Sequence, residues 1–163
     1  MASEATSVTA PYTTKNEWVL WLVAASCALH AAEEYLTGWQ AWAPKALGIV
    51  MPTSLFLGVN AMLVVAALVL ARIGWRRPTL SLVIPAATLV NAVFFHILPT
   101  LVQHQVSPGV YTATLLYLPF SSWAFLGARR DGVPARAKVV ALLAGTLMML
   151  VVAAAARSVG NQS

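Results

Sequence analysis

Five apolar runs, each close to 20 residues long, restrict what this chain can fold into. They cover approximately residues 18–35, 54–73, 80–102, 111–126 and 139–156. A helix needs ~20 residues to cross the ~30 Å hydrocarbon core of a bilayer. Lipid offers no hydrogen bonds to backbone groups, and the runs are continuous rather than alternating, so they predict helices and not strands. We therefore expect an all-α protein, a polytopic membrane bundle of about five transmembrane helices.

Composition excludes an ordinary soluble domain. The 163 residues are 60% hydrophobic and only 9% charged, whereas soluble domains are about 25% charged. We expect a single five-helix membrane domain over residues 15–157, between a disordered cytoplasmic tail at residues 1–14 and a C-terminal tail at residues 158–163. The first residues do not combine a basic segment with a short apolar core, which argues against a cleaved signal peptide.

Basic residues in the loops predict the orientation of the bundle. Two loops are rich in them: Arg72, Arg76 and Arg77 follow the second run, and Arg129, Arg130, Arg136 and Lys138 lie between the fourth and the fifth. The positive-inside rule places these loops in the cytoplasm, with the N-terminus inside and the C-terminus outside. The loops account for the net charge of +5, so we expect no nucleic-acid partner.

Three ionisable residues end the first run. His30, Glu33 and Glu34 belong to a chain with only five acidic residues. On a helix, positions i, i+3 and i+4 lie on one face, so all three side chains can point into the same volume. The predicted orientation puts them in the outer half of the membrane.

Later runs carry polar residues at a similar predicted depth. Asn60 lies two turns into the second run, Asn91 and His96 lie in the third, and His104 lies just beyond its end. Ionisable groups inside a membrane are costly and usually face the bundle interior. We therefore predict a polar cavity in the outer half of the bundle, the alternative being separate interfacial and helix-packing roles.

Three further features lie close to this predicted cavity. The tryptophan-rich residues 38–52 are typical of an interfacial belt, and a lid over a lateral entrance is the alternative. Pro99 interrupts the third run and is expected to free the carbonyl of Phe95, beside His96. Cys27 is expected to be a small buried hydrophobe, with a nucleophile paired with His30 or a thiolate ligand as the alternatives.

The motif His30-Ala-Ala-Glu33-Glu34, followed by Asn91 and His96, resembles the family of bacterial and archaeal membrane proteins named after its HXXEE motif. The likeness covers most of the chain, roughly from the first run to the fourth. The function of that family is uncharacterised, so the resemblance implies which residues matter rather than what they do. It implies a prokaryotic cytoplasmic membrane, and the orientation predicted from the basic loops puts the site on the extracytoplasmic side.

The leading hypothesis is a metal-dependent enzyme of the hydrolase or oxidoreductase type. Two or three imidazoles with a carboxylate suit zinc or non-haem iron and leave an open position for water or substrate. The candidate ligands are His30, Glu34, His96 and His104. His104 ranks below His96 because eight residues of straight helix separate the two by about 12 Å.

The remaining polar residues would act on the substrate, expected to be a lipid or a small apolar molecule from the bilayer. Of Glu33 and Glu34, one would bind the metal and the other would act as a general base. Asn91 or Asn60 would orient a ligand or a developing oxyanion.

Two other classes of function stay open. A metal-free isomerase or cyclase could use the same residues for acid–base chemistry on an isoprenoid or sterol-like lipid. A metal or proton transporter, or a lipid-binding accessory protein, would need no catalysis. Against transport, the ionisable residues stop halfway across the membrane and the sequence has no evident internal repeat. The sequence leaves the oligomeric state open.

Overall fold

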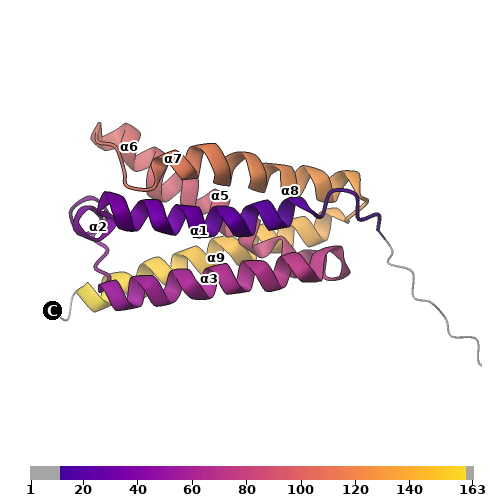
Figure 1. Cartoon of the computed structure of the whole chain (residues 1–163), viewed down its shortest axis with the longest axis horizontal. Coiled ribbons are helices and arrows are strands. Elements are labelled where there is room, and N and C mark those ends of the chain that lie inside the picture. Colours follow the sequence, from indigo (N-terminus) through magenta and orange to yellow (C-terminus); the bar gives the residue numbers. More distant parts are fainter. Residues whose placement is uncertain (1–11, 161–163) are drawn as a thin grey trace, which may run out of the picture.

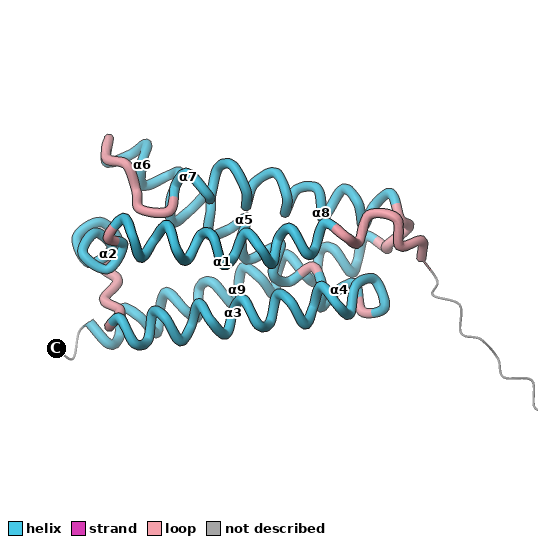
Figure 2. Tube along the Cα trace, in the orientation of Figure 1, coloured by secondary structure: helices cyan, strands magenta, loops and turns pink. Residues whose placement is uncertain are grey.

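The computed structural model describes residues 12–160, and these residues form one elongated bundle of helices (Figure 1). Their elements are α1 (Val19–Thr37), α2 (Trp39–Leu47), α3 (Thr53–Ile73), the 3₁₀ turn η1 (Gly74–Arg76), α4 (Pro78–Ser81), α5 (Val83–Asn91), the π-helix η2 (Ala92–Ile97), α6 (Leu98–Gln103), α7 (Val110–Thr112), the π-helix η3 (Ala113–Tyr117), α8 (Leu118–Arg130) and α9 (Ala135–Gly160). Short loops join them (Figure 2). The predicted all-α bundle is confirmed. The predicted tails lie outside the described residues, apart from 12–14 and 158–160.

Four helices are long and apolar enough to cross a membrane, which makes this chain a membrane protein. They are Val19–Thr37, Thr53–Arg76, Pro78–Gln103 and Ala135–Ser158. These correspond to four of the five predicted runs.

The predicted run 111–126 is not among those four helices. It falls in α7, η3 and α8, which follow one another beside α1 along the length of the bundle (Figure 1). Hydroxyl groups make this segment more polar, and some of them bond inside the bundle: Ser121 Oγ lies 2.7 Å from Thr88 Oγ1. The start of α1 and the end of α9 lie at opposite ends of the bundle (Figure 1). A chain with this arrangement runs along the length of the bundle an odd number of times.

Close packing holds α9 against α5 and α3 against α1. A Cβ atom on Gly145 of α9 would lie 2.6 Å from Ala86 Cβ and 2.7 Å from Ala87 N, so only glycine fits there. Lipid tails are as apolar as a helix face, so helices in a membrane associate through such close van der Waals contact rather than through the hydrophobic effect.

Two π-helices, η2 and η3, pack against each other. Each is followed by the same dipeptide, Leu98-Pro99 after η2 and Leu118-Pro119 after η3. Proline lacks an N–H group and its ring clashes with the carbonyl one turn back. The wider π turn accommodates the ring: Leu98 N–H bonds the Val93 carbonyl and Leu118 N–H bonds the Ala113 carbonyl, each five residues back. The break predicted at Pro99 thus takes the form of a π-helix.

The short helix α2 closes one end of the bundle and occupies much of the predicted non-spanning segment 38–52. Its Trp39 stacks on Phe56 of α3, with ring centroids 5.6 Å apart. Its last carbonyl, on Leu47, accepts hydrogen bonds from Nε and Nη2 of Arg157 at 3.3 and 3.0 Å. Cations are favoured at helix C-termini, which explains a basic residue at the end predicted to be outside.

The buried carboxylate of Asp131 ties the opposite end together. It accepts hydrogen bonds from Thr13 Oγ1 at 3.0 Å, from the backbone N–H and Nδ2 of Asn16 at 2.8 and 2.7 Å, and from Trp75 Nε1 at 2.9 Å. Glu17 accepts from the Trp75 backbone N–H at 3.0 Å. Burial alone would raise the pKa of the Asp131 carboxyl, but the donors on Asn16, Trp75 and Thr13 hold that pKa below its usual value.

Replacing this carboxylate should destabilise the protein in a pH-dependent way. Asp131→Ala removes the acceptor from several donors, and each unsatisfied buried group costs about 1–3 kcal/mol, so we expect a lower Tm in detergent at pH 7. The pKa of Asp131 is lower in the folded than in the unfolded state, so its stabilisation is complete above the unfolded-state value, ~3.9, and is lost as the pH falls through the folded-state value. The Tm difference between wild type and the non-ionising Asp131→Asn should shrink over that range. A constant difference would show that the ionised Asp131 carboxylate does not stabilise this end of the bundle.

Cysteine labelling tests the predicted orientation. Arg76 and His104 are both exposed. Arg76 follows the end of α3 and His104 follows the end of α6, and these two helices end at opposite ends of the bundle (Figure 1). In a Cys27→Ala background, an impermeant maleimide added to intact cells should label His104→Cys, and should label Arg76→Cys only after permeabilisation. Labelling of both positions from one side would show the orientation to be wrong.

Candidate metal centre

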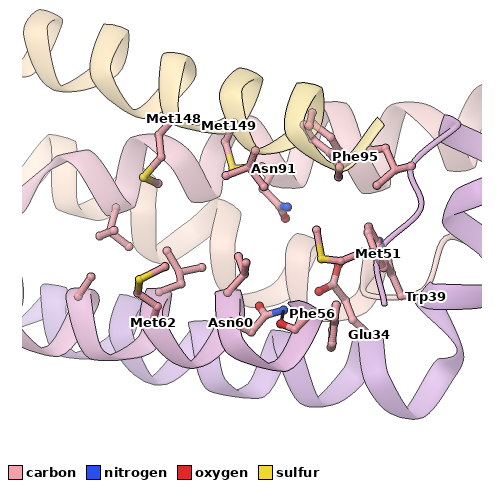
Figure 3. A pocket seen from close by; sticks show the side chains of 18 residues that line it. Glu34, Trp39, Met51, Phe56, Asn60, Met62, Asn91, Phe95, Met148 and Met149 are labelled. Carbon is pink, nitrogen blue, oxygen red and sulfur yellow. Dashed lines mark hydrogen bonds between the residues drawn. The ribbon is translucent and has the colours of Figure 1, made fainter. Parts of the chain in front are cut away.

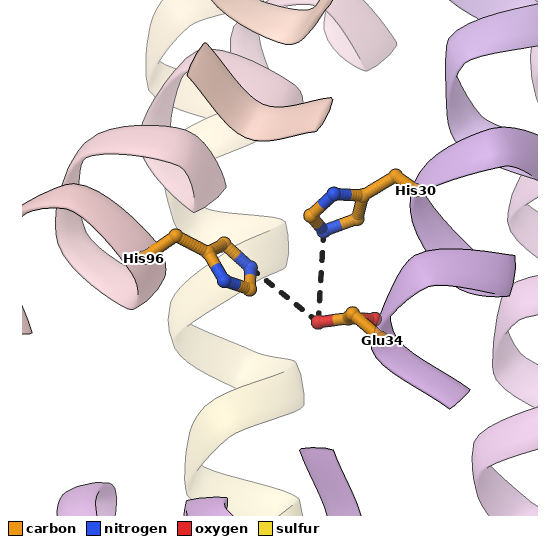
Figure 4. A group of neighbouring side chains, drawn as sticks. All are labelled: His30, Glu34 and His96. Atoms are coloured by element: carbon orange, nitrogen blue, oxygen red, sulfur yellow. Dashed lines mark ion pairs between the residues drawn. The ribbon is translucent and has the colours of Figure 1, made fainter. Parts of the chain in front are cut away.

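Three of the predicted metal ligands meet inside the bundle (Figure 4). His30 and Glu34 extend from α1, one helical turn apart, and His96 extends from η2. Nε2 of His30 lies 3.6 Å, and Nε2 of His96 lies 3.4 Å, from the same atom, Oε1 of Glu34. Their side chains are almost completely buried, with residue exposures of 2%, 6% and 0% for His30, Glu34 and His96. The structure thus gathers two imidazoles and one carboxylate from distant parts of the sequence.

The spacing of these atoms suits metal ligands better than direct hydrogen bonds. Nε2 of each histidine is buried and has no hydrogen-bond partner in residues 12–160. Charge-assisted N–H···O bonds are about 2.7–2.9 Å long, shorter than either distance to Glu34. Around a tetrahedral metal with bonds of about 2.0–2.1 Å, neighbouring ligand atoms are about 3.4 Å apart. The two separations that involve Glu34, 3.4 and 3.6 Å, are close to that edge length, and all three candidate ligand atoms lie within 4.8 Å of one another.

Hydroxyl groups hold the far side of both imidazole rings. His30 Nδ1 lies 2.8 Å from Thr112 Oγ1, and His96 Nδ1 lies 3.1 Å from Ser107 Oγ. Each hydroxyl also approaches a backbone carbonyl, at 3.3 Å for Thr112 and 3.4 Å for Ser107. Since a carbonyl can only accept, the most hydrogen bonds form when each hydroxyl donates to its carbonyl and accepts from Nδ1–H. In that tautomer both Nε2 lone pairs face Glu34, as metal ligation requires.

The break at Pro99 contributes to this arrangement. Proline leaves the carbonyl of Phe95, one turn back, without its helical donor, and this is the carbonyl that the Ser107 hydroxyl approaches at 3.4 Å. The same hydroxyl holds His96, which lies in the π-helix. π-helical turns are rare and occur frequently at functional sites.

The backbone of Gly109 covers the cluster. A Cβ atom on this residue would lie 2.8 Å from His96 Cε1, 2.9 Å from Glu34 Cγ and 2.9 Å from His30 Cε1. Its φ of +93° also lies in the region that side chains rarely adopt. Glycine is therefore required here by both backbone conformation and space.

The two adjacent glutamates point to different places. Glu33 lies outside the cluster: its Oε2 accepts from the Thr112 backbone N–H at 2.7 Å and its Oε1 accepts from that of Tyr111 at 3.2 Å. A carboxylate at a helix N-terminus satisfies unpaired N–H groups and complements the helix dipole. Because Thr112 also bonds His30, Glu33 can position the cluster without touching it.

A cavity of about 370 Å³ lies next to the cluster (Figure 3). Glu34 forms part of its wall, and Asn60 and Asn91 supply the other polar lining. Apart from the indole N–H of Trp39, which is buried without a partner among the described residues, the remaining wall is apolar; it comes from α2, α3, α5, η2, α9 and the segment before α3. The two predicted asparagines therefore lie in the cavity and not among the candidate ligands.

Two other candidates lie apart from the ligand cluster. His104 is exposed at the end of α6, with a φ of 54°. Cys27 is buried beside Tyr117 and is not part of the ligand group found among the described residues. Tyr117 also lies beside the cluster, with its ring centroid 4.4 Å from that of His30, and the sequence indicated no role for it.

The sequence did not identify the groups that support the ligands. Ser107-Pro108-Gly109 consists of typical turn residues, but nothing in it indicates that Ser107 bonds His96 or that Gly109 covers the cluster. The sequence did not indicate that Thr112 would bond His30, because hydroxyl residues are common near the starts of helices. The repeated Leu-Pro pair is the feature that could have indicated two matching distortions.

Comparison with known proteins identifies a family. A family model described as "Protein of unknown function with HXXEE motif" matches residues 21–124. That stretch runs from α1 into α8 and contains His30, Glu34, His96 and Gly109. No curated protein and no solved structure matches the chain.

Adding one methyl group at Gly109 should damage the cluster. We expect Gly109→Ala to lower the Tm in detergent much more than Gly132→Ala. Gly132 has a similar φ of +86°, but a Cβ atom there would meet nothing within 4 Å, so that variant isolates the cost of backbone strain, roughly 1–2 kcal/mol. Equal losses of Tm would show that Gly109 does not press on the three side chains.

Proposed function

The chain belongs to the family of proteins with an HXXEE motif, and we propose that it is a membrane-embedded, metal-dependent enzyme of the hydrolase or oxidoreductase type. Its substrate is a lipid or a small apolar molecule. The observation that supports this most strongly is the convergence of two unpaired imidazole nitrogens on one buried carboxylate oxygen.

A divalent cation resolves the electrostatics of this cluster. A buried carboxylate is costly unless it is paired, and a buried imidazole nitrogen needs a partner. One cation bound by His30, His96 and Glu34 satisfies all three and leaves at least one position open. Two imidazoles and one carboxylate are a donor set of catalytic zinc sites and of non-haem iron sites. When bound, such a metal activates water or polarises a substrate oxygen.

Residues around the cluster would orient its imidazole rings and keep water away from them. Thr112 and Ser107 fix the rotation and the tautomer of the two imidazoles, and Gly109 keeps solvent off their Cε1 side. Glu33 already accepts two backbone hydrogen bonds, which favours a positioning role for it over that of general base. Hydrogen-bond partners of metal ligands commonly affect metal affinity or activity by 10–100-fold.

The apolar cavity would bring the substrate from the bilayer to the cluster. Its walls include α3 and α9, which are the least buried of the candidate spans and therefore the ones most open to lipid. The cluster lies toward the end of α1 that is opposite the arginine-rich loops. By the positive-inside rule, we place the reaction on the extracytoplasmic side of a prokaryotic cytoplasmic membrane.

A metal-free acid–base reaction on an isoprenoid or sterol-like lipid is the second candidate. Glu34 lies between two imidazoles and also lines an apolar cavity, so it could exchange a proton with an apolar substrate. Metal analysis separates this candidate from the first.

Elemental analysis of the purified full-length protein tests the proposal. We expect about one zinc or iron ion per chain in wild type, and loss of at least nine-tenths of it in His30→Ala, Glu34→Gln and His96→Ala. His104→Ala is the matched control, because it removes an exposed imidazole outside the cluster, and it should retain the metal.

A second matched pair separates the two glutamates. Glu33→Gln keeps the ligand set and should still bind metal at saturation, with an affinity about 10–100-fold weaker. Glu34→Gln should not bind even then. Folded wild type that binds neither ion after dialysis against zinc or iron would refute the metal centre and favour the acid–base candidate.

A further inference from the structure

The cavity beside the cluster has a polarity that selects among lipids. Its lining includes Asn60, Asn91 and Glu34 but no lysine or arginine. A phosphate or free carboxylate headgroup would therefore find no cationic side chain in this cavity, and burying an unpaired charge is strongly unfavourable. The wall favours a neutral ligand.

The two asparagines offer hydrogen-bond acceptors. Asn91 Oδ1 is buried and has no partner in the described part of the chain. Asn60 Nδ2 donates to the Phe56 carbonyl at 3.0 Å, which fixes its amide and leaves its Oδ1 as the free end. The side chains approach the cavity from opposite walls, Asn60 on α3 and Asn91 at the end of α5 (Figure 3). A buried acceptor without a donor is unfavourable, so Asn91 suits a ligand that donates. Trp39 lines the same cavity and its Nε1–H is a buried donor without a partner in the described residues, which suits a ligand that accepts. A hydroxyl group can do both.

The shape of the cavity suits one flexible chain. Its volume of about 370 Å³ lies near the lower end of the ~300–1,000 Å³ range of small-molecule pockets, which favours a single chain over a two-chain lipid. Four of the five methionines in the sequence line it: Met51, Met62, Met148 and Met149. Methionine is unbranched and adapts to irregular apolar shapes. Glu34 lies toward one end, Met62 and Met148 toward the other, and the asparagines between them (Figure 3).

We propose that this cavity binds a neutral single-chain lipid bearing a hydroxyl group. The hydroxyl donates to Asn91 Oδ1, the apolar chain extends toward Met62 and Met148, and the ligand enters from the bilayer between α3 and α9. The claim that this lipid is the substrate or product of the metal centre rests on the proposed function. The claim that the cavity binds the lipid rests on the cavity alone.

Two probes of equal chain length test the hydroxyl: 1-dodecanol, which donates and accepts, and methyl dodecyl ether, which only accepts. Binding to full-length protein in nanodiscs is measured from the rise in Tm with probe mole fraction in the bilayer, which removes differences in partitioning. We expect wild type to bind the alcohol about tenfold more tightly than the ether, ~1.4 kcal/mol. Asn91→Leu should reduce this ratio to about one.

Met149→Leu is the matched control, because it changes an apolar lining residue and should keep the tenfold preference. Equal binding of both probes by wild type, or an unchanged preference in Asn91→Leu, would overturn the inference. Binding of neither probe would overturn it as well.

The metal content of the same samples distinguishes this inference from the proposed function. Asn91 is not a candidate ligand, so Asn91→Leu should retain the metal. A preference for the alcohol in wild type that binds no metal would refute the metal-dependent function alone. Full metal occupancy without the preference would refute the ligand class alone.

Discussion

Neither the interior of a membrane nor the packed interior of a protein offers water to solvate an unpaired polar group, so each buried polar side chain must find its partner within the bundle. The structure meets this requirement in two different ways. At one end, Asp131 is surrounded by N–H and O–H donors, including Trp75 Nε1 at 2.9 Å, and needs nothing more. Toward the other end, Glu34 faces two imidazole nitrogens at distances too long for strong hydrogen bonds. The first carboxylate is satisfied by the fold, whereas the second is arranged as if for a cation.

The same requirement explains why the helices are distorted where they are. Pro99 and Pro119 each remove a donor from a helix, and the two π-helices before them pack against each other. These turns bring His96 and Tyr117 from two different helices to the side of His30, with ring centroids at 4.7 and 4.4 Å. Regular helices would present other residues at this level. The backbone irregularities that weaken the two helices therefore build the wall of the site.

Local properties of the sequence predicted the helices and the residues of the cluster. Features that depend on contacts between distant residues could not be predicted in this way. Hydropathy is a local property, so the apolar runs could be located from the sequence, although the run 111–126 carries inward hydroxyls that make it a poorer candidate span. Ionisable residues are rare in such runs, which singled out His30, Glu34 and His96. The sequence could not separate Glu33 from Glu34, because positions i+3 and i+4 share a helix face. In the structure, the N–H groups of Tyr111 and Thr112 bind Glu33, and Glu34 faces the two histidines.

That division of roles gives the HXXEE motif a physical interpretation. His30 and Glu34, at i and i+4, present two candidate ligand atoms on one face of α1, while Glu33 holds the start of the α7 segment through Tyr111 and Thr112. The neighbouring glutamates also face different spaces: Glu34 lines the apolar cavity, and Glu33 lines a smaller one of about 80 Å³ with polar groups such as Ser107. A cluster between these two cavities can receive an apolar molecule from the larger cavity while its imidazoles keep contact with polar groups on the side of the smaller one. Adjacent glutamates are a compact way to specify both sides from a single helical turn.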